Sequence, residues 1–172
     1  MVLNNFIIHI GGPTASGKTS LAIELALLLG TEIVSSDSRQ CYKEMSIGTA
    51  VPTKDEQSKV LHHFIHSHSI QSPLTAGSYA SEAGHLVSSL LEKYGSAVVV
   101  GGSPLYGDAL LYGLDDFPKV DESILEQLSK QSLEELSHQI KKLDPISAED
   151  IDHQNRRRLE RALSICLQTG KP

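Results

Sequence analysis

A chain of 172 residues with 40% hydrophobic residues is long enough to bury one sizeable core, so we expect an ordinary globular fold. No stretch approaches the roughly 18 apolar residues that a membrane span needs, and the apolar run Phe6–Ile10 leads straight into glycines rather than to a cleavage site. These features predict a cytoplasmic protein with no membrane partner. A net charge of -6 argues against bulk coating of nucleic acid, which needs many Lys and Arg contacts.

The N-terminal elements alternate between strand and helix patterns. Phe6–Ile10 is a short β-branched run that ends at Gly11, which is typical of a buried strand. Lys18–Leu29 has apolar residues at helical spacing and stops before Gly30, a usual position for a helix C-cap. Glu32–Ser35 predicts a second short strand. The order strand, loop, helix, strand is typical of an α/β fold.

The central part continues this alternation. Val51–Ser72 is the least regular segment and predicts a short helix followed by a strand. Ser78–Tyr94 has helical periodicity, and Ala97–Val100 is a buried strand that runs into Gly101. We therefore expect a parallel sheet covered by helices on both faces, with ligands at the carboxyl ends of the strands. One crevice should be shared by the loops after Ile10, Ser35 and Val100.

The C-terminal part shows only helical patterns. The expected helices are Glu122–Ser129, Leu133–Leu143, Ser147–Ile151 and Asn155–Gln168. The sequence thus predicts an α/β core over residues 1–120 and a helical appendage over residues 121–172. The last residues, Thr169–Pro172, follow directly on a helix end and look like a connection, so we expect a continuation.

The segment Gly12–Thr19 fits the pattern G-x-x-x-x-G-K-[ST], with a strand before it and a helix after it. Its glycines let backbone N–H groups point into one anion-binding nest, and the helix N-terminus adds positive charge. Lys18 would reach the terminal phosphates, and Thr19 would ligate a bridging Mg²⁺ ion. The pattern predicts a P-loop NTPase-like sheet and binding of a diphosphate or nucleotide. The predicted phosphate site is Gly12, Pro13, Thr14, Ala15, Ser16, Gly17, Lys18 and Thr19.

Two further loops in the expected crevice carry polar groups. Asp37 could be a Mg²⁺ partner, a general base or the cap of the next turn, and its spacing favours the cap. Ser103 follows two glycines after a strand, so its hydroxyl could meet the ligand, or the segment could be only a tight turn. Its place in the crevice slightly favours a functional role.

Other clusters of reactive residues have simpler interpretations. His62, His63, His66 and His68 lack suitably spaced Cys or acidic ligands, and adjacent strand residues face opposite ways, which favours structural or substrate-lining histidines over a metal cluster. The cysteines Cys41 and Cys166 lack metal-ligand spacing, and we expect free thiols.

A basic run near the C-terminus is a candidate contact surface. Arg157 and Arg161 lie one helical turn apart and share a face that could hold nucleic-acid or pyrophosphate oxygens. A solvated, salt-bridged face is equally plausible, because Glu160 follows closely.

Taken together, six motifs in one order resemble those of tRNA dimethylallyltransferases. They are Gly12–Thr19, Ser36–Tyr42, Ile47–Ala50, His62–Ile65, Gly101–Tyr106, and Arg161–Leu163 with Thr169–Pro172. The resemblance spans almost the whole chain, but roughly the first half to three fifths of a typical family member.

The resemblance implies transfer of a dimethylallyl group from its diphosphate to N6 of an adenosine next to the tRNA anticodon, with release of diphosphate. The phosphate loop would then hold dimethylallyl diphosphate with Mg²⁺, and the target base would be flipped out of its loop. The implied catalytic residues are Asp37, Ser103 and Lys18. The implied tRNA contacts are Asp37, Ser38, Arg39, Gln40, Ser103, Arg157, Arg158, Leu159, Glu160 and Arg161. We expect a monomer.

The chain departs from the family pattern at three positions. Ser103 stands where Thr is usual, Pro104 replaces a glycine, and Leu125 stands where an Arg commonly contacts tRNA. Alternative functions are a non-catalytic remnant that binds diphosphate or tRNA, an adenylate isopentenyltransferase, and a small-molecule kinase that uses the loop for ATP.

Overall fold

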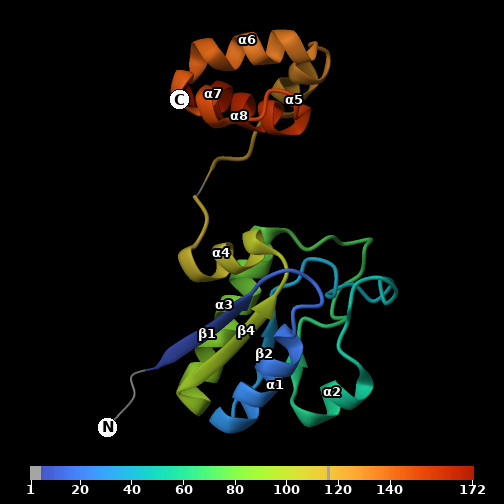
Figure 1. The fold of residues 1–172 in the computed structure, drawn as a ribbon. Helices are drawn as coiled ribbons and strands as arrows, with labels where there is room; N and C mark the ends of the chain where they lie inside the picture. Colours follow the sequence, from blue (N-terminus) through green and yellow to red (C-terminus); the bar gives the residue numbers. More distant parts are fainter. Residues whose placement is uncertain (1–4, 116) are drawn as a thin grey trace. The chain divides into compact units, whose positions relative to one another are not determined.

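A computed structural model describes residues 5–115 and 117–172 and shows two compact units (Figure 1). The first unit is Met1–Leu114, and the second is Asp115–Pro172. This division and the sequence-based one at residue 120 both fall between the last helix of the first unit and the first helix of the second. Within the described residues, no helix is long and apolar enough to cross a membrane.

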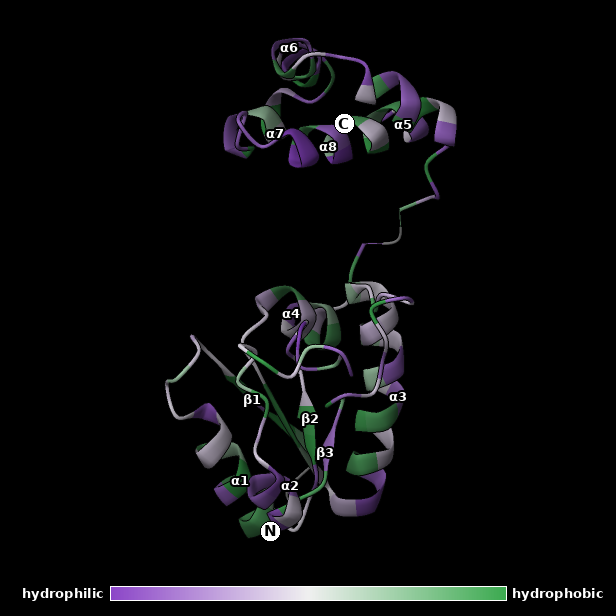
Figure 2. Ribbon diagram, turned by 90° about the vertical axis from the view of Figure 1, so that its right-hand side faces the viewer, coloured by the Kyte–Doolittle hydropathy of each residue, from purple (hydrophilic) through white to green (hydrophobic). Residues whose placement is uncertain are grey.

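The first unit is built on a parallel sheet with the strand order β1-β4-β2-β3. The strands are β1 (Phe6–Gly11), β2 (Ile33–Ser35), β3 (His62–His63) and β4 (Ser96–Gly101). In the register, Gly11 lies opposite Gly101, and Ser35 lies opposite Val100. The loops that follow β1, β2 and β4 therefore leave the sheet at the same edge. Figure 2 shows β1 and β2 as hydrophobic strands.

Helices cover both faces of this sheet, as the sequence predicts. They are α1 (Lys18–Leu29), α2 (Lys54–Lys59), α3 (Ala76–Tyr94) and α4 (Pro104–Tyr112). On one face, α1 packs against Ile33 and Val98, and on the other, α3 packs against Val34 and Val99. Successive strand residues point to opposite faces, so β2 and β4 contribute to both cores.

The predicted elements of this unit are confirmed, and one helix was missed. α1 has the predicted bounds and ends at Gly30, whose φ of 64° suits a glycine C-cap. α4 was not predicted, because glycines flank it and Gly107 lies inside it. A Cβ atom on Gly107 would lie 2.7 Å from the ring of His9, an exposed side chain that would have to turn to make room for it. Pro104 occupies the first turn of α4, where its missing N–H costs no helical hydrogen bond.

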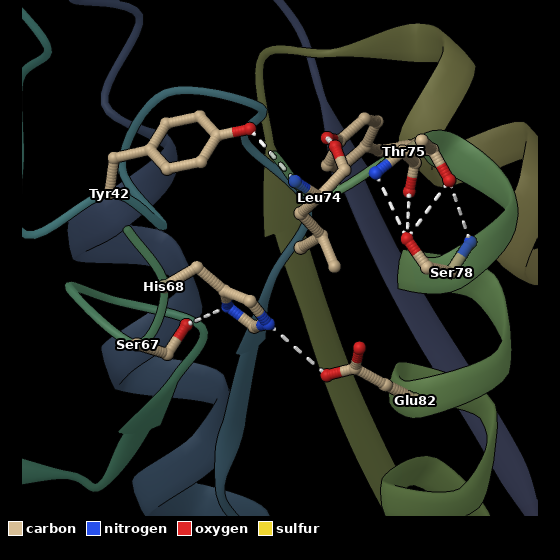
Figure 3. A network of polar contacts seen from close by, with 8 residues as sticks. Tyr42, Ser67, His68, Leu74, Thr75, Ser78 and Glu82 are labelled. Atoms are coloured by element: carbon tan, nitrogen blue, oxygen red, sulfur yellow. Dashed lines mark hydrogen bonds and ion pairs between the residues drawn. The ribbon is translucent and has the colours of Figure 1, made fainter. Parts of the chain in front are cut away.

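The segment between β3 and α3 is fixed to the rest of the first unit by polar contacts (Figure 3). The hydroxyl of Tyr42 accepts a hydrogen bond of 3.1 Å from the Leu74 N–H, and the hydroxyl of Tyr106 donates to the Leu74 carbonyl. Nε2 of His68 lies 3.3 Å from the Glu82 carboxylate on α3. The two hydrogen bonds to the Leu74 backbone tie the loop after β2 and the start of α4 to the same residue.

At the amino-terminal end of β2, the Glu32 carboxylate gathers three side chains. The Tyr94 hydroxyl donates to Oε1 at 2.7 Å, Nε2 of His63 lies 2.6 Å from Oε2, and the Lys93 ammonium lies 3.7 Å from Oε1. Hydrogen bonds from Tyr94 and His63 lower the pKa of Glu32 below its ordinary value of 4.5. This lowered pKa links the stability of the fold to pH.

Glu32→Gln is expected to flatten the acid side of the stability profile. A carboxylate with a lowered folded pKa stabilises the fold above its unfolded pKa, and this contribution disappears as the pH falls through the folded pKa. Urea unfolding between about pH 7 and pH 3 should therefore show a weaker pH dependence for this variant than for the unaltered chain. Glu24→Gln, at an exposed position of α1, is the matched control. Equal pH dependence in Glu32→Gln and the unaltered chain would contradict this account.

In the second unit, the regular elements of the described residues, 115 and 117–172, are all helices. Its helices are α5 (Glu122–Ser129), α6 (Leu133–Leu143), α7 (Pro145–Asp150) and α8 (Arg156–Thr169). Ser132 begins α6 with a capping box to Glu135, and Asn155 caps α8. The core of this unit consists of Leu128, Leu136, Ile140, Ala148, Leu159, Leu163 and Cys166. The predicted helices of this part are confirmed, although α7 begins two residues earlier and ends one residue earlier than predicted.

Candidate phosphate-binding and transfer site

The phosphate loop between β1 and α1 has the backbone of an anion nest. Gly12 and Gly17 have φ values of 147° and 82°, and Ala15 adopts a φ of 65°. Gly17 is the N-cap of α1 and makes no side-chain capping bond. The first N–H groups of α1 therefore receive no hydrogen bond acceptor from a capping side chain. The N-terminus of the helix also carries partial positive charge.

Lys18 is folded back onto this loop. Its ammonium donates to the Pro13 carbonyl and lies 3.4 Å from the Ser16 hydroxyl, which itself donates to Pro13 at 2.8 Å. The charge thus lies over the loop, where an anion in the nest would meet it. Thr19 is half-buried at the first turn of α1 and lines the same cavity.

A cavity of about 160 Å³ lies at the carboxyl ends of the strands. We call it the phosphate cavity. The loops after β1, β2 and β4 all contribute to it, which confirms the single crevice predicted from the sequence. Its lining comprises Thr14, Ala15, Ser16, Gly17, Lys18, Thr19, Ser20, Ser35, Asp37, Gln40, Ala50, Pro52, His62, Ile65, Val100, Gly101 and Gly102.

Asp37 uses its two carboxylate oxygens differently. Oδ1 accepts hydrogen bonds from the N–H groups of Arg39 at 2.9 Å and Gln40 at 3.3 Å, so the predicted cap is confirmed. Oδ2 faces Gly102, since a Cβ atom on that glycine would lie 3.3 Å from it. Within the described residues, the hydrogen bonds to this carboxylate use only Oδ1. The capping role therefore leaves one oxygen for a ligand.

A second cavity of about 480 Å³ adjoins the first, and we call it the acceptor cavity. The two cavities share Thr14, Asp37 and Gly102. The rest of its lining is Ser38, Arg39, Gly48, Thr49, Ser103, Pro104, Leu105 and Tyr106. The Ser103 hydroxyl accepts from the Ser38 N–H and donates to the Ser38 hydroxyl, both at 2.9 Å. Ser103 thus joins the β4 loop to the loop that carries Asp37.

Gly101 packs closely against the backbone of Ser36, in the loop that carries Asp37. A Cβ atom at position 101 would lie 2.4 Å from the carbonyl carbon, carbonyl oxygen and hydroxyl of Ser36, the residue before Asp37. We expect Gly101→Ala to push the two loops apart, to destabilise the first unit by about 1–3 kcal/mol and to weaken diphosphate binding. Gly84→Ala on α3, where the added Cβ meets no atom within 4 Å, should instead stabilise by roughly 0.5–1 kcal/mol. Urea unfolding of both variants measures the difference, and equal stability would contradict this packing.

The adjacent histidines face different surroundings, as expected for neighbours on a strand. His63 binds Glu32, whereas His62 lines the phosphate cavity. Nδ1 of His62 lies 2.8 Å from the Val60 carbonyl, and burial lowers the pKa of this imidazole. Nε2 of His62 has no hydrogen-bond partner within the described residues. No group of three or more His, Cys, Asp or Glu residues in residues 5–115 and 117–172 could hold a metal ion.

The basic run on α8 divides into structural and exposed residues. The Arg156 guanidinium donates to carbonyl groups at the end of α5 and pairs with Glu160 at 2.8 Å. Glu160 therefore forms its ion pair with Arg156. The exposed residues of the basic run are Arg157, Arg158 and Arg161. Leu159 is fully buried in the core of the helical unit, so its side chain packs there instead of facing solvent. Leu125 is half-exposed on α5.

The sheet order and the glycine-rich loop between β1 and α1 define an α/β protein with a P-loop-like fold. A family model described as IPP transferase matches residues 40–172. The chain belongs to the IPP transferase family. A tRNA dimethylallyltransferase of Christiangramia forsetii is 49% identical over 175 residues, covering 99% of this chain and 58% of that protein. One of Cytophaga hutchinsonii is 41% identical over 174 residues, covering 99% of this chain and 57% of that protein.

Solved structures give the same result. The tRNA isopentenylpyrophosphate transferase of Bacillus halodurans has 33% sequence identity and a TM-score of 0.63, covering 98% of this chain and 57% of that one. A eukaryotic dimethylallyltransferase acting on tRNA has 26% identity and a TM-score of 0.82, covering 98% of this chain and 42% of that one. The chain spans 58% and 57% of the length of the two curated relatives named above.

Proposed function

We propose that this chain transfers a dimethylallyl group from dimethylallyl diphosphate to N6 of an adenosine beside the tRNA anticodon. The observation that carries the proposal is the junction of two cavities at Asp37 and Gly102. One cavity is built around a phosphate loop, and the other opens beside the free carboxylate oxygen of Asp37. Two substrates could meet there. The names of the relatives support this choice of substrates.

The donor side stabilises the leaving group. As the bond between the dimethylallyl carbon C1 and the diphosphate oxygen breaks, its electron pair goes to the diphosphate. The loop N–H groups, the N-terminus of α1 and the Lys18 ammonium would neutralise this developing charge. Lys18 must then exchange its contact with the Pro13 carbonyl for a phosphate oxygen.

Mg²⁺ fits this site as an ion bound by substrate phosphates and one side chain. Mg²⁺ commonly uses one or two protein ligands plus phosphate oxygens, so a cage of several carboxylates is not required. We propose that the Thr19 hydroxyl is its protein ligand, because Thr19 lines the phosphate cavity at the start of α1. The ion would add positive charge to the leaving diphosphate.

The acceptor side supplies a proton acceptor. Oδ2 of Asp37 would accept a hydrogen bond from the N6 amine of a flipped-out adenine in the acceptor cavity. As the N6–C1 bond forms, the amine proton passes to this carboxylate. Ser103 holds the Asp37 loop through Ser38 and positions the carboxylate. Ser38, Arg39 and Gln40 lie next to it, and Arg39 lines the acceptor cavity.

The helical unit offers a separate surface for the RNA backbone. Arg157, Arg158 and Arg161 are exposed on α8, and guanidinium groups bind phosphate oxygens in a bidentate manner. Glu160 is occupied by Arg156 and therefore does not neutralise them. We propose that these cations bind tRNA phosphates, and that the protein acts in the cytoplasm as a monomer.

The test is product analysis with the chain, Mg²⁺ and dimethylallyl diphosphate. An anticodon stem-loop with adenosine at the acceptor position is compared with the same stem-loop carrying guanosine there, and with free AMP. Nucleosides are separated after digestion and identified by mass. We expect N6-dimethylallyladenosine from the first RNA only. Preferential modification of AMP would indicate the adenylate enzyme. Phosphoryl transfer in a parallel reaction that contains ATP, without prenyl transfer in the first, would indicate a kinase.

A further inference from the structure

One part of the phosphate cavity is apolar. Ala50, Pro52 and Ile65 line it, and we call these residues the apolar wall. The phosphate loop supplies the polar part of the same cavity through Thr14, Ser16 and Lys18. A ligand that consisted only of phosphate groups would gain nothing from contact with hydrocarbon. The combination fits a molecule with a charged head and a short apolar tail.

The backbone of this wall is strained. The described residues other than glycine with positive φ are Ala15, Ala50, Phe64 and His66, at 65°, 52°, 60° and 48°. Ala15 and Ala50 line the phosphate cavity, and Phe64 and His66 flank Ile65 on both sides. Bulky residues rarely adopt such conformations, which persist only when the surroundings enforce them and which gather at ligand sites. Two of these residues line the phosphate cavity, and the other two are the chain neighbours of Ile65, which lines it as well.

Contacts with neighbouring residues fix the two segments that form the apolar wall, one around Ala50 and one around Ile65. The Phe64 ring packs edge-on against buried Tyr79, with ring centroids 5.1 Å apart. The backbone carbonyl of Gln40 accepts a hydrogen bond from the His66 N–H at 2.9 Å. The side-chain Nε2 of Gln40 donates to the backbone carbonyls of Thr49 and Ala50 at 3.1 Å and 3.0 Å. Gln40 thus joins the two segments that carry Ala50 and Ile65. The wall is a built feature and not a chance exposure of apolar atoms.

We propose that the apolar wall holds the hydrocarbon tail of the prenyl diphosphate, and that Ile65 limits the tail to one isoprene unit. This inference rests on the proposed function. With the diphosphate in the loop and C1 near Asp37, the tail needs an apolar surface within the same cavity. Ile65 supplies a surface of fixed shape, because its β-branched side chain has few rotamers and its neighbours fix its backbone. A smaller residue at this position opens space for a longer tail.

The test compares Ile65→Ala and Ile65→Phe with the unaltered chain, and uses three probes: inorganic diphosphate, dimethylallyl diphosphate and geranyl diphosphate. Ile65→Ala is expected to shift the affinity ratio toward geranyl diphosphate by about tenfold, which is the effect of one or two methylene contacts. Ile65→Phe fills the space and is expected to weaken dimethylallyl diphosphate binding by about tenfold. Both variants should bind inorganic diphosphate within about twofold of the unaltered chain, because the Ile65 side chain is apolar and offers a diphosphate oxygen no hydrogen-bond donor.

Leu61→Ala is the matched control, because Leu61 lies in the same segment, is half-exposed and does not line the phosphate cavity. It should leave all three affinities unchanged. An unchanged ratio in Ile65→Ala, with inorganic diphosphate still bound, would overturn the assignment of the tail while leaving the proposed function intact. A parallel loss of all three ligands in both Ile65 variants would show a purely structural role and would also overturn it. If the unaltered chain bound no diphosphate, the proposed function itself would fail.

Discussion

Lys18→Ala is expected to lower the rate of single-turnover prenyl transfer by about 10²- to 10³-fold, the usual cost of removing one preorganised charge from a developing anion. The affinity for inorganic diphosphate should fall as well, by about 10- to 100-fold, since hydrogen bonds to charged groups contribute about 1.5–3 kcal/mol. Lys18 has no ion pair with an acidic group in the described structure, and its contacts are with its own loop. Its loss should therefore leave the stability of the fold nearly unchanged.

Lys54→Ala provides the control for charge. Lys54 is exposed at the start of α2 and lines neither the phosphate cavity nor the acceptor cavity. Titration calorimetry with inorganic diphosphate, and transfer assays with both variants, separate a local effect from a change in net charge. If the two lysine variants behaved alike, Lys18 would not be the phosphate ligand, and the interpretation of the loop would have to be abandoned.

Asp37→Asn is the second change with a large expected effect. Asparagine keeps an oxygen that can accept from the Arg39 and Gln40 N–H groups, so the cap and the fold should persist. It replaces Oδ2 by an amide nitrogen, which cannot take the proton of the adenine amine. The transfer rate should fall by about 10²- to 10⁴-fold, the usual contribution of a general base, while dimethylallyl diphosphate binds as before.

Asp37→Ala distinguishes the two roles of this carboxylate. Alanine removes the cap as well as the proton acceptor, so it should cost about 1 kcal/mol of stability that Asp37→Asn does not. Urea unfolding and single-turnover transfer are measured on both variants. Normal transfer by Asp37→Asn would show that the carboxylate only caps the turn, and another proton acceptor would then be needed.

Local sequence signals predicted most of the fold. α1, α5 and α6 have the predicted bounds. Gly30 ends α1 in the left-handed conformation and Ser132 begins α6 with a capping box, so these two boundaries are encoded locally. The phosphate loop and the shared crevice followed from one motif and from the parallel order of the strands. α4 was not predicted, and its interior glycine, Gly107, lies beside the His9 ring on β1, a neighbour that the local sequence does not reveal.

The parts of the site that were missed depend on contacts between distant residues. Gln40 was assigned only to tRNA, but its side chain holds the Thr49 and Ala50 carbonyls. The acceptor cavity arises where three loops meet, and no single segment encodes it. Leu159 was grouped with its basic neighbours, although helical spacing places it with Leu163 on the buried side of α8. That periodicity was the signal that could have separated it from the exposed arginines.

The most direct test of the central claim is single-turnover transfer from labelled dimethylallyl diphosphate to an anticodon stem-loop, with the unaltered chain and Mg²⁺. The account predicts label on N6 of the acceptor adenosine, with release of one diphosphate for each label transferred. Transfer should be strongly slowed in Lys18→Ala, through weaker donor binding and weaker stabilisation of the leaving diphosphate, and in Asp37→Asn with the donor still bound. Tight binding of the donor and the stem-loop by the unaltered chain, without any transfer of label, would contradict the claim that these residues form a complete transfer site.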